Sequence, residues 1–525
     1  MTMFTTTRRS GDRARMFRLP AVLALALLPM LADASVVTLD SGRIEGETIG
    51  AVDRYLGVPY AAEPVGALRW RAPQAPAPWQ DVRPALQPGS ACMQVGNLYA
   101  SAEADTFDKP YGSEDCLFLN VWVPQQTARS RPVLIFFHGG SGIFGAASHP
   151  LYDGARLAEA TGAVIITANY RLGVWGSLQS PALQTGDAAE DSGSFFLLDM
   201  IRVLDWTRAN CAAFGCDADN ITISGQSAGA VAVLALLRSP LAKGKFQHVI
   251  SFSGLPFSAS QKTAQKRTAT LLTQLLIDDG SAANEDDAAR WLAAKTPAQL
   301  HDYLYGKSAQ ALLAASGSGL SPAYVADGTV LMHVDKPDEL ANDVVSAVPM
   351  MFGNVHDEMN TLTPIKTVGR SAARLWPLVN GEPRDRTINQ QLGFFGGISR
   401  DLRVFFANCL VRHELRKAER AYARQLPALY VYHFEWQDYP DPWHSEMGVF
   451  HGLDVPFVFG TFIDDRPMYM RFAWTPENRD EREALHERMA HAIGAFIRDG
   501  DPNDARTTGE RWLPWNDNEY TKTWK

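Results

Sequence analysis

Residues 221–230 constrain the possible fold of this chain more than any other segment. They read ITISGQSAGA, so a β-branched run gives way to the pentapeptide GQSAG, and a small apolar stretch, AVAVLALL, follows. A serine in this pattern lies on a sharp turn between a strand and a helix, where its hydroxyl stands above the sheet. Side chains in place of the two glycines would collide with that strand and helix. The pattern predicts a strand–turn–helix unit and indicates Ser227 as a candidate nucleophile.

Alternating strands and helices are expected around this unit. Continuous apolar runs at 131–137 (RPVLIFF) and 163–168 (AVIITA) are typical of strands buried on both faces, and a helical pattern lies between them. A long helical segment, 195–214, leads to the strand before Ser227. This order predicts an α/β fold with a parallel sheet and helices on both faces. Further core strands are expected at 246–253, 348–353 and 430–436.

The candidate functional motifs lie far apart in the sequence and must meet in one site. We therefore expect one domain over residues 35–525, although length alone would suggest about three. Residues 255–345 are more polar and helical, and a capping box, TPAQ, opens one helix at Thr296. We expect this region to form a helical insertion over the active site.

The first 34 residues have the pattern of a secretory signal. Five arginines precede an apolar stretch, 21–31, that is too short to span a bilayer, and residues 32–34 form an A-x-A cleavage site. Translation could begin at Met1 or at Met16, because a complete signal follows either one. We expect cleavage after Ala34 and a periplasmic or secreted protein without a membrane anchor.

Charge and cysteine content narrow the partners further. The formal net charge of −9 argues against nucleic acid and against anionic membrane surfaces. Disulfides are permitted in an exported protein. Cys92 and Cys116 would close a loop, and Cys211 and Cys216 can pair if their Cα atoms come within about 7 Å. Cys409 is then left over, and we expect it to be buried in its helix.

We expect no bound metal. The five cysteines contain no C-x2-C pair, which disfavours a four-cysteine metal site. His486 and His491 resemble a zinc-binding helix motif but are five residues apart, a spacing that does not share a helix face.

A glycine-rich segment, HGGSGIFG, follows the first apolar run at 138–145. Glycines let backbone N–H groups turn towards a developing negative charge, as an oxyanion requires. The same residues contain G-x-G-x-x-G, which can indicate dinucleotide binding. That motif needs an acidic residue about 20 positions later, and position 165 is Ile. A dinucleotide-dependent oxidoreductase is therefore disfavoured.

Eight blocks in this order resemble the type-B carboxylesterase family, the branch of the α/β-hydrolases that includes the cholinesterases. They cover nearly the whole chain after residue 34. The resemblance implies an α/β-hydrolase fold, with a central, mostly parallel sheet and helices on both faces. The blocks are residues 55–70, 114–124, 138–145, 169–176, 214–229, 353–360, 448–460 and 499–503.

The resemblance also implies roles for single residues. Ser227 matches the nucleophile, His451 the base and Glu358 the triad acid, with Asp357 its rival on spacing alone. The chain order of serine, acid and histidine is the one this fold requires. Three backbone N–H groups match the oxyanion donors of the family, those of Gly140, Ser141 and Ala228. The cysteine of the second block, Cys116, is paired in the family with an upstream cysteine, here Cys92.

Several positions depart from the family pattern. Gln226 stands where the family often has an acid, which disfavours cationic, choline-like substrates. Ser141 replaces a glycine of the oxyanion segment, and Cys216 replaces a glycine before the nucleophile strand. Four aromatic residues are expected to narrow the mouth of the substrate pocket: Phe144, Trp175, Phe195 and Phe196. Gln226 is a fifth candidate for the lining of this pocket.

These residues predict a serine carboxylic-ester hydrolase that works through an acyl-enzyme. Its substrate is expected to be an uncharged small-molecule ester with a bulky or aromatic group, and no cofactor is expected. The alternative is a cholinesterase-like binding protein without catalysis, a class that usually lacks a triad member. The sequence leaves the oligomeric state open.

Overall fold

The computed structural model describes most of the chain after the predicted signal. The described residues are 34–125, 130–317, 322, 324–332, 343–360, 371–379, 388–466, 468–507, 510–516 and 519–525. Residues 1–33, which hold nearly all of the predicted signal sequence and both candidate starts, lie outside the described residues. The signal sequence therefore remains a prediction.

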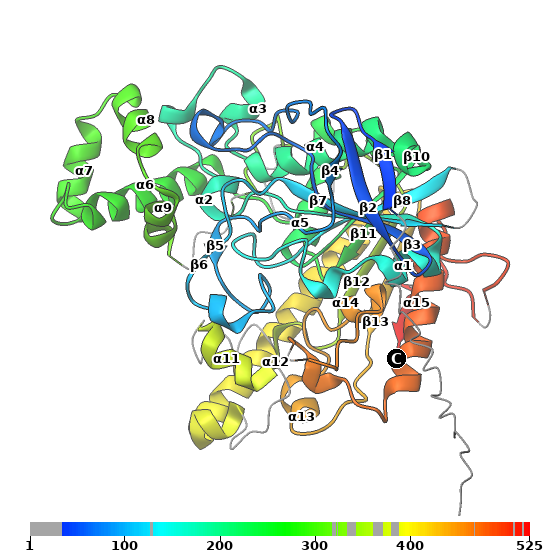
Figure 1. Cartoon of the computed structure of the whole chain (residues 1–525). Coiled ribbons are helices and arrows are strands. Elements are labelled where there is room, and N and C mark those ends of the chain that lie inside the picture. Colours follow the sequence, from blue (N-terminus) through cyan, green and yellow to red (C-terminus); the bar gives the residue numbers. More distant parts are fainter. Residues whose placement is uncertain are drawn as a thin grey trace, which may run out of the picture.

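A mixed sheet of twelve strands forms the centre of the described structure (Figure 1). Its strands follow the order β1-β2-β3-β7-β9-β8-β10-β11-β12-β13-β14, with β4 paired to β2. The first five strands of this order, β1-β2-β3-β7-β9, pair antiparallel to one another. From β9 onward, through β8 to β14, neighbouring strands pair in parallel. The predicted α/β class is confirmed.

The strand bounds are β1 (Ala34–Thr38), β2 (Arg43–Ile49), β3 (Val52–Pro59), β4 (Arg83–Pro84), β7 (Phe118–Pro124), β8 (Arg131–Phe137), β9 (Val164–Ala168), β10 (Cys216–Gln226), β11 (His248–Phe252), β12 (Met350–Val355), β13 (Leu429–Phe434) and β14 (Thr521–Trp524). Two further short strands, β5 (Gln94–Val95) and β6 (Pro110–Tyr111), pair with each other outside this sheet.

Alternate side chains of β8 define the two faces of the sheet. Ile135 and Phe137 join the core that includes α4 (Phe195–Asn210) and α5 (Ala228–Leu236). Phe136 joins the opposite core, with α1 (Ala155–Thr161) and α15 (Arg479–Asp499). Successive side chains of a strand point to opposite faces. The continuous apolar run is therefore what a strand with helices on both sides requires.

Four helices follow β11 and project at one end of the molecule, beside the sheet (Figure 1). They are α6 (Gln261–Asp278), α7 (Glu285–Ala293), α8 (Pro297–Tyr305) and α9 (Ala309–Ser316). The predicted capping box opens α8: the Gln299 N–H donates to the Thr296 hydroxyl at 3.3 Å, and the Thr296 N–H donates to the Gln299 side chain at 3.0 Å.

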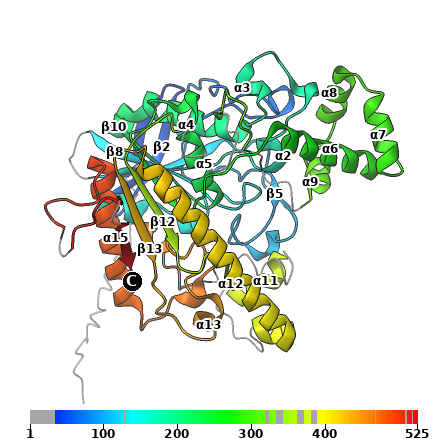
Figure 2. The same ribbon diagram turned by 180° about the vertical axis from the view of Figure 1, so that it is seen from behind.

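The longest of the described helices, α12, crosses in front of β12 and β13 in the view from behind (Figure 2). None of the described helices is both long and apolar enough to cross a membrane. The other described helices are α2 (Gly173–Gly176), α3 (Ala188–Asp191), α11 (Ala372–Val379), α12 (Ile388–Ala423), α13 (Trp443–Met447) and α14 (Val455–Phe459).

Both predicted disulfides are present. Cys92 bonds to Cys116 with 4.9 Å between their Cα atoms, and Cys211 bonds to Cys216 with 5.0 Å between theirs. The prediction for Cys409 is wrong, because this residue is exposed. Asn408, its neighbour on α12, points inward, and the helical turn therefore directs Cys409 to solvent.

We predict that replacing Cys92 and Cys116 together by serine lowers the free energy of unfolding by about 3 kcal/mol, because the open chain gains loop-closure entropy. Urea unfolding under non-reducing conditions measures the change. Cys409→Ser is the matched control and should unfold like the wild type. An unfolding curve of the double variant that overlays the wild type would contradict the prediction.

Candidate active site

Ser227 lies between the end of β10 and the start of α5, with φ 55° and ψ −121°. A positive φ is costly for serine, and the surroundings hold it there. The Ser227 N–H donates to the carbonyl of Phe252, at the end of β11, at 2.9 Å. A Cβ on Gly225 would lie 2.4 Å from the backbone of Gly229, and one on Gly229 would lie 2.1 Å from the Phe137 carbonyl. Both flanking glycines are therefore required by close backbone approach.

His451 and Glu358 come together from two separate loops. His451 lies between α13 and α14, and its Nδ1 makes a short hydrogen bond with Glu358 Oε2. Glu358 follows β12, is 6% exposed, and accepts the Val355 N–H through its other oxygen at 3.0 Å. Burial lowers the pKa of His451, but the carboxylate of Glu358 and its hydrogen bond more than offset this, so the pKa is raised above its ordinary value.

Gln226 joins this pair to the nucleophile turn. Its side-chain nitrogen lies 3.0 Å from His451 Nε2. An amide N–H can only donate, so Nε2 is the acceptor and the ring proton lies on Nδ1, towards Glu358. This is the tautomer that a general base needs. Gln226 precedes Ser227 directly, so the contact brings the free nitrogen of the imidazole to the turn that carries the serine.

The glycine-rich segment lies directly against Ser227. A Cβ on Gly139 would be 3.1 Å from Ser227 Cβ. Gly140 and Ser141 both have positive φ, 105° and 57°, and Ser141 is exposed. Ala228 is the first residue of α5, where backbone N–H groups have no partner within the helix. The three predicted oxyanion donors thus belong to two segments that meet at the serine.

His138, at the start of the glycine-rich segment, is buried and contacts the backbone of that segment. It is 1% exposed, its Nδ1–H donates to the Gly139 carbonyl at 2.8 Å, and its ring stacks on Tyr170 with 4.6 Å between centroids. Burial lowers the pKa of His138 to about 4, so it is neutral near pH 7. These contacts favour a structural role over that of a base.

Asp357, the rival acid, connects the two loops and does not contact the imidazole in any interaction of the described structure. Its N–H donates to the Val449 carbonyl at 2.8 Å, and its carboxylate accepts the Val449 N–H at 3.0 Å. Asn360 donates to the Met447 carbonyl at 2.9 Å. Asn408 of α12 completes the connection, since it accepts the Met359 N–H at 2.8 Å and donates to Asn360 at 3.0 Å.

The predicted aromatic residues divide into two groups. Phe195, Phe196 and Trp175 are at most 5% exposed and belong to the hydrophobic core, so they do not form an exposed pocket mouth. Phe144 is half-buried and stacks on Tyr99, which in turn contacts Tyr469.

Sequence reasoning missed two tyrosines that contact the segments beside Ser227, Tyr324 and Tyr99. Tyr324 donates its hydroxyl to the Ala228 carbonyl at 3.0 Å and packs edge-on against Phe196. It comes from the segment that follows α9. Tyr99, Tyr324 and Tyr469 are isolated in the sequence, and no local pattern connects them to Ser227.

The described residues contain no group of three or more His, Cys, Asp or Glu side chains arranged to hold a metal ion. His486 and His491 face different partners, the carbonyl of Phe457 and the carboxylate of Asp504.

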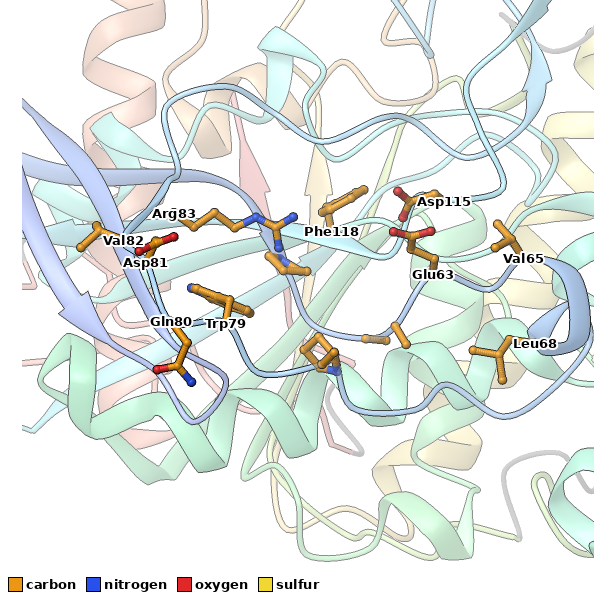
Figure 3. A pocket seen from close by; sticks show the side chains of 15 residues that line it. Glu63, Val65, Leu68, Trp79, Gln80, Asp81, Val82, Arg83, Asp115 and Phe118 are labelled. Carbon is orange, nitrogen blue, oxygen red and sulfur yellow. The ribbon is translucent and has the colours of Figure 1, made fainter.

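A surface pocket of about 750 Å³ lies apart from Ser227. Figure 3 shows Glu63 and Asp115 close together at one side of it, with Arg83 and Trp79 towards the other. Burial and the nearby Glu63 raise the pKa of Asp115. The pocket opens between the ends of β3 and β7, and β3 lies four strands from β10. That separation is roughly 19 Å at about 4.8 Å per strand.

Comparison with known proteins gives consistent matches over most of the chain. The sequence profile described as the carboxylesterase family matches residues 33–374 and 386–523. The para-nitrobenzyl esterase of Bacillus subtilis (strain 168) is 31% identical over 489 residues, which cover 89% of this chain and 90% of that protein. The fumonisin B1 esterase of Sphingopyxis macrogoltabida is 31% identical over 431 residues, covering 80% and 74%.

Solved structures agree with these matches. A PNB esterase superimposes with a TM-score of 0.72 at 27% identity, covering 94% of this chain and 96% of that one. A carboxylesterase of Geobacillus stearothermophilus superimposes with a TM-score of 0.71 at 31% identity, covering 93% and 96%.

We predict that Asn408→Ala lowers the free energy of unfolding by about 1–3 kcal/mol, because the Met359 N–H and the side-chain oxygen of Asn360 each lose their hydrogen bond to Asn408. Denaturant titration measures the loss. His413→Ala, on the exposed side of the same helix, is the control and should stay within about 0.5 kcal/mol of the wild type. Equal stability of the two variants would show that the Asn408 contacts add nothing.

Proposed function

This chain belongs to the carboxylesterase family and is an ester hydrolase, and we propose that Ser227, His451 and Glu358 are the catalytic triad with which it works. One observation carries the proposal. Contacts run without a break from Glu358 to His451 Nδ1, and from His451 Nε2 to Gln226, the residue before Ser227. A carboxylate, an imidazole of the correct tautomer and a strained serine are what acyl transfer by a serine hydrolase requires.

In the first half of the reaction, the Ser227 hydroxyl replaces the Gln226 amide at His451 Nε2. His451 takes the serine proton as the oxygen attacks the ester carbonyl, and Glu358 stabilises the charged imidazole without accepting its proton. The N–H groups of Gly140, Ser141 and Ala228 bind the oxyanion of the tetrahedral intermediate. Collapse breaks the bond to the alcohol, which leaves with the proton from His451, and an acyl-enzyme remains.

In the second half, water takes the place of the alcohol. His451 removes a proton from the water as it attacks the acyl carbonyl, and the same N–H groups bind the oxyanion. Collapse returns the proton to Ser227 and releases the acid. Both halves use one base and one oxyanion site, so the region needs no further group.

The substrate we propose is an uncharged ester with an aromatic or bulky part. Gln226 is neutral where an acid would attract a cation. Aromatic rings lie on the two segments beside the serine, with Phe144 and Tyr99 stacked at 5.4 Å and Tyr324 hydrogen-bonded to Ala228. The name of the Bacillus relative refers to para-nitrobenzyl esters, whose alcohol part is aromatic. Stacking on such rings would favour substrates of this kind.

We also propose that the protein works in the periplasm or outside the cell. The signal-like pattern before Ala34 supports export. The two disulfides support it independently, because disulfides persist mainly in oxidising compartments.

The triad predicts unequal effects of substitution at two neighbouring carboxylates. Glu358→Gln should lower kcat for a para-nitrophenyl ester by about 10³–10⁴-fold, because the imidazole loses its orienting partner. Asp357→Asn, the adjacent control, should keep kcat within about tenfold, since its carboxylate contacts the Val449 backbone and the His356 ring and not His451. If Asp357→Asn instead caused the larger loss, the acid would be assigned wrongly.

A fluorophosphonate probe separates catalysis from simple binding. It should label the wild type and leave Ser227→Ala unlabelled, because only an activated serine reacts with it. A folded wild-type protein that stays unlabelled would favour the binding protein over the esterase.

Because Gln226 is uncharged, replacing it with a carboxylate should shift the pH dependence of kcat/KM. His451 must be neutral to act as base, so kcat/KM should rise with pH through its raised pKa. Gln226→Glu places a carboxylate beside Nε2, favours the charged imidazole, and should move this acidic limb to higher pH. Gln226→Met, similar in size and uncharged, should not move it upward. An unchanged limb in Gln226→Glu would contradict the contact with His451.

A further inference from the structure

Four large apolar side chains are exposed together on α12, and we call them the apolar stripe. They are Leu402, Phe405, Phe406 and Leu410, exposed to 55%, 58%, 66% and 62%. The other large apolar side chains exposed among the described residues are scattered singly over strands and loops. Single exposed apolar residues are ordinary, whereas a contiguous patch indicates a surface that another molecule covers.

The spacing of the stripe places all four side chains on one face of the helix. They occupy positions i, i+3, i+4 and i+8, and Cys409 at i+7 is exposed beside them. The opposite face is already used, since Val404 and Asn408 are buried against the body of the protein. The packing of α12 on its own molecule thus leaves more than half of each stripe side chain exposed.

The size of the stripe suits the centre of a protein interface. With about 200 Å² for a whole side chain, its four members expose on the order of 400–500 Å² of apolar surface. A stable interface buries about 800 Å² on each partner, slightly more than half of it apolar. The stripe supplies that apolar centre, and the polar residues around it would supply the rim.

The pattern of the stripe is self-complementary. Leu402 and Leu410 lie four residues on either side of Phe406, and the Phe405 and Phe406 rings contact each other with 5.6 Å between centroids. An interface between two identical copies about a two-fold axis uses the same patch on both. Two antiparallel α12 helices would set Phe406 against Phe406 and Leu402 against Leu410 of the second copy.

Charges at the two ends of the stripe agree with this arrangement. Asp401, with a side chain 58% exposed and paired to Arg400 at 2.9 Å, precedes the stripe, and the partly exposed Arg412 follows it. In an antiparallel pair each Asp401 comes next to Arg412 of the second copy. Opposite charges at a rim fix register. An anionic lipid surface fits less well, because the chain carries a net charge of −9.

We propose that two copies of this chain associate through the apolar stripe, with their α12 helices antiparallel about a two-fold axis near Phe406. Sedimentation velocity over roughly 1–100 µM is the test. The full-length protein should sediment as a dimer in the upper part of that range. Phe406→Glu should sediment as a monomer at the same concentrations, because it places two carboxylates against each other in an apolar centre.

Two controls keep the result specific. Leu513→Glu changes another exposed leucine (50% exposed), outside the apolar stripe, and should stay dimeric. Asp401→Arg and Arg412→Asp should each weaken the dimer, and the two together should restore it, because the charges are then exchanged.

A measurement on the wild-type protein alone tests the proposal even if a variant fails to fold. Alkylation of Cys409 should slow as the concentration rises into the dimer range, since the dimer covers this thiol. A monomer throughout the range, a dimer that Phe406→Glu leaves intact, or a monomer that binds phospholipid vesicles would each overturn the proposal.

Discussion

The geometry of the site depends on holding Ser227 in a left-handed backbone conformation that serine rarely adopts. Strain of this kind costs on the order of 1–3 kcal/mol and persists only when the surroundings over-determine it. Here β10 is paired along both edges, by β8 and β11, and the contact from the Ser227 N–H to Phe252 extends that pairing to the serine. The sheet thus holds the hydroxyl above its edge, where a base and an oxyanion site can reach it.

Opposing electrostatic effects act on the imidazole of His451, which contacts the residue before Ser227. Burial favours its neutral form, and Glu358 favours its charged form. A second carboxyl group, Asp454, is fully buried nearby, accepts the Tyr432 hydroxyl at 2.9 Å, and has a pKa raised by burial to about 6. Gln226 adds no charge on the other side of the ring. The balance leaves the free nitrogen of the ring as an acceptor, ready to take a proton.

Local patterns predicted the parts of the site that local sequence determines. The strand, the two glycines and Ser227 are consecutive, so steric limits on one turn sufficed to foresee it. Glu358 and His451 came from resemblance to a family, because nothing in spacing distinguishes Glu358 from Asp357. The distinction is three-dimensional: one carboxylate faces the imidazole and its neighbour faces the backbone of Val449.

Long-range packing also explains the other differences between the sequence-based predictions and the structure. Tyr99 stacks on Phe144 and Tyr324 contacts Ala228 from segments far apart in the sequence, whereas Phe195 and Phe196 are buried in the core. The segment around Cys409 is apolar on several sides, so its pattern could not fix which side faces the core. The structure turns Asn408 inward and the phenylalanines outward. Sequence periodicity therefore located this helix but not its orientation.

The central claim is that ester hydrolysis passes through an acyl group on Ser227. Its most direct test is to mix the enzyme with an aryl ester, quench with acid within milliseconds, and locate the acyl group by peptide mass spectrometry. The account predicts an acyl adduct in the tryptic peptide 209–238, on Ser227, that appears before the steady state and decays when the substrate is exhausted. Hydrolysis without an adduct, or with one on another residue, would contradict it.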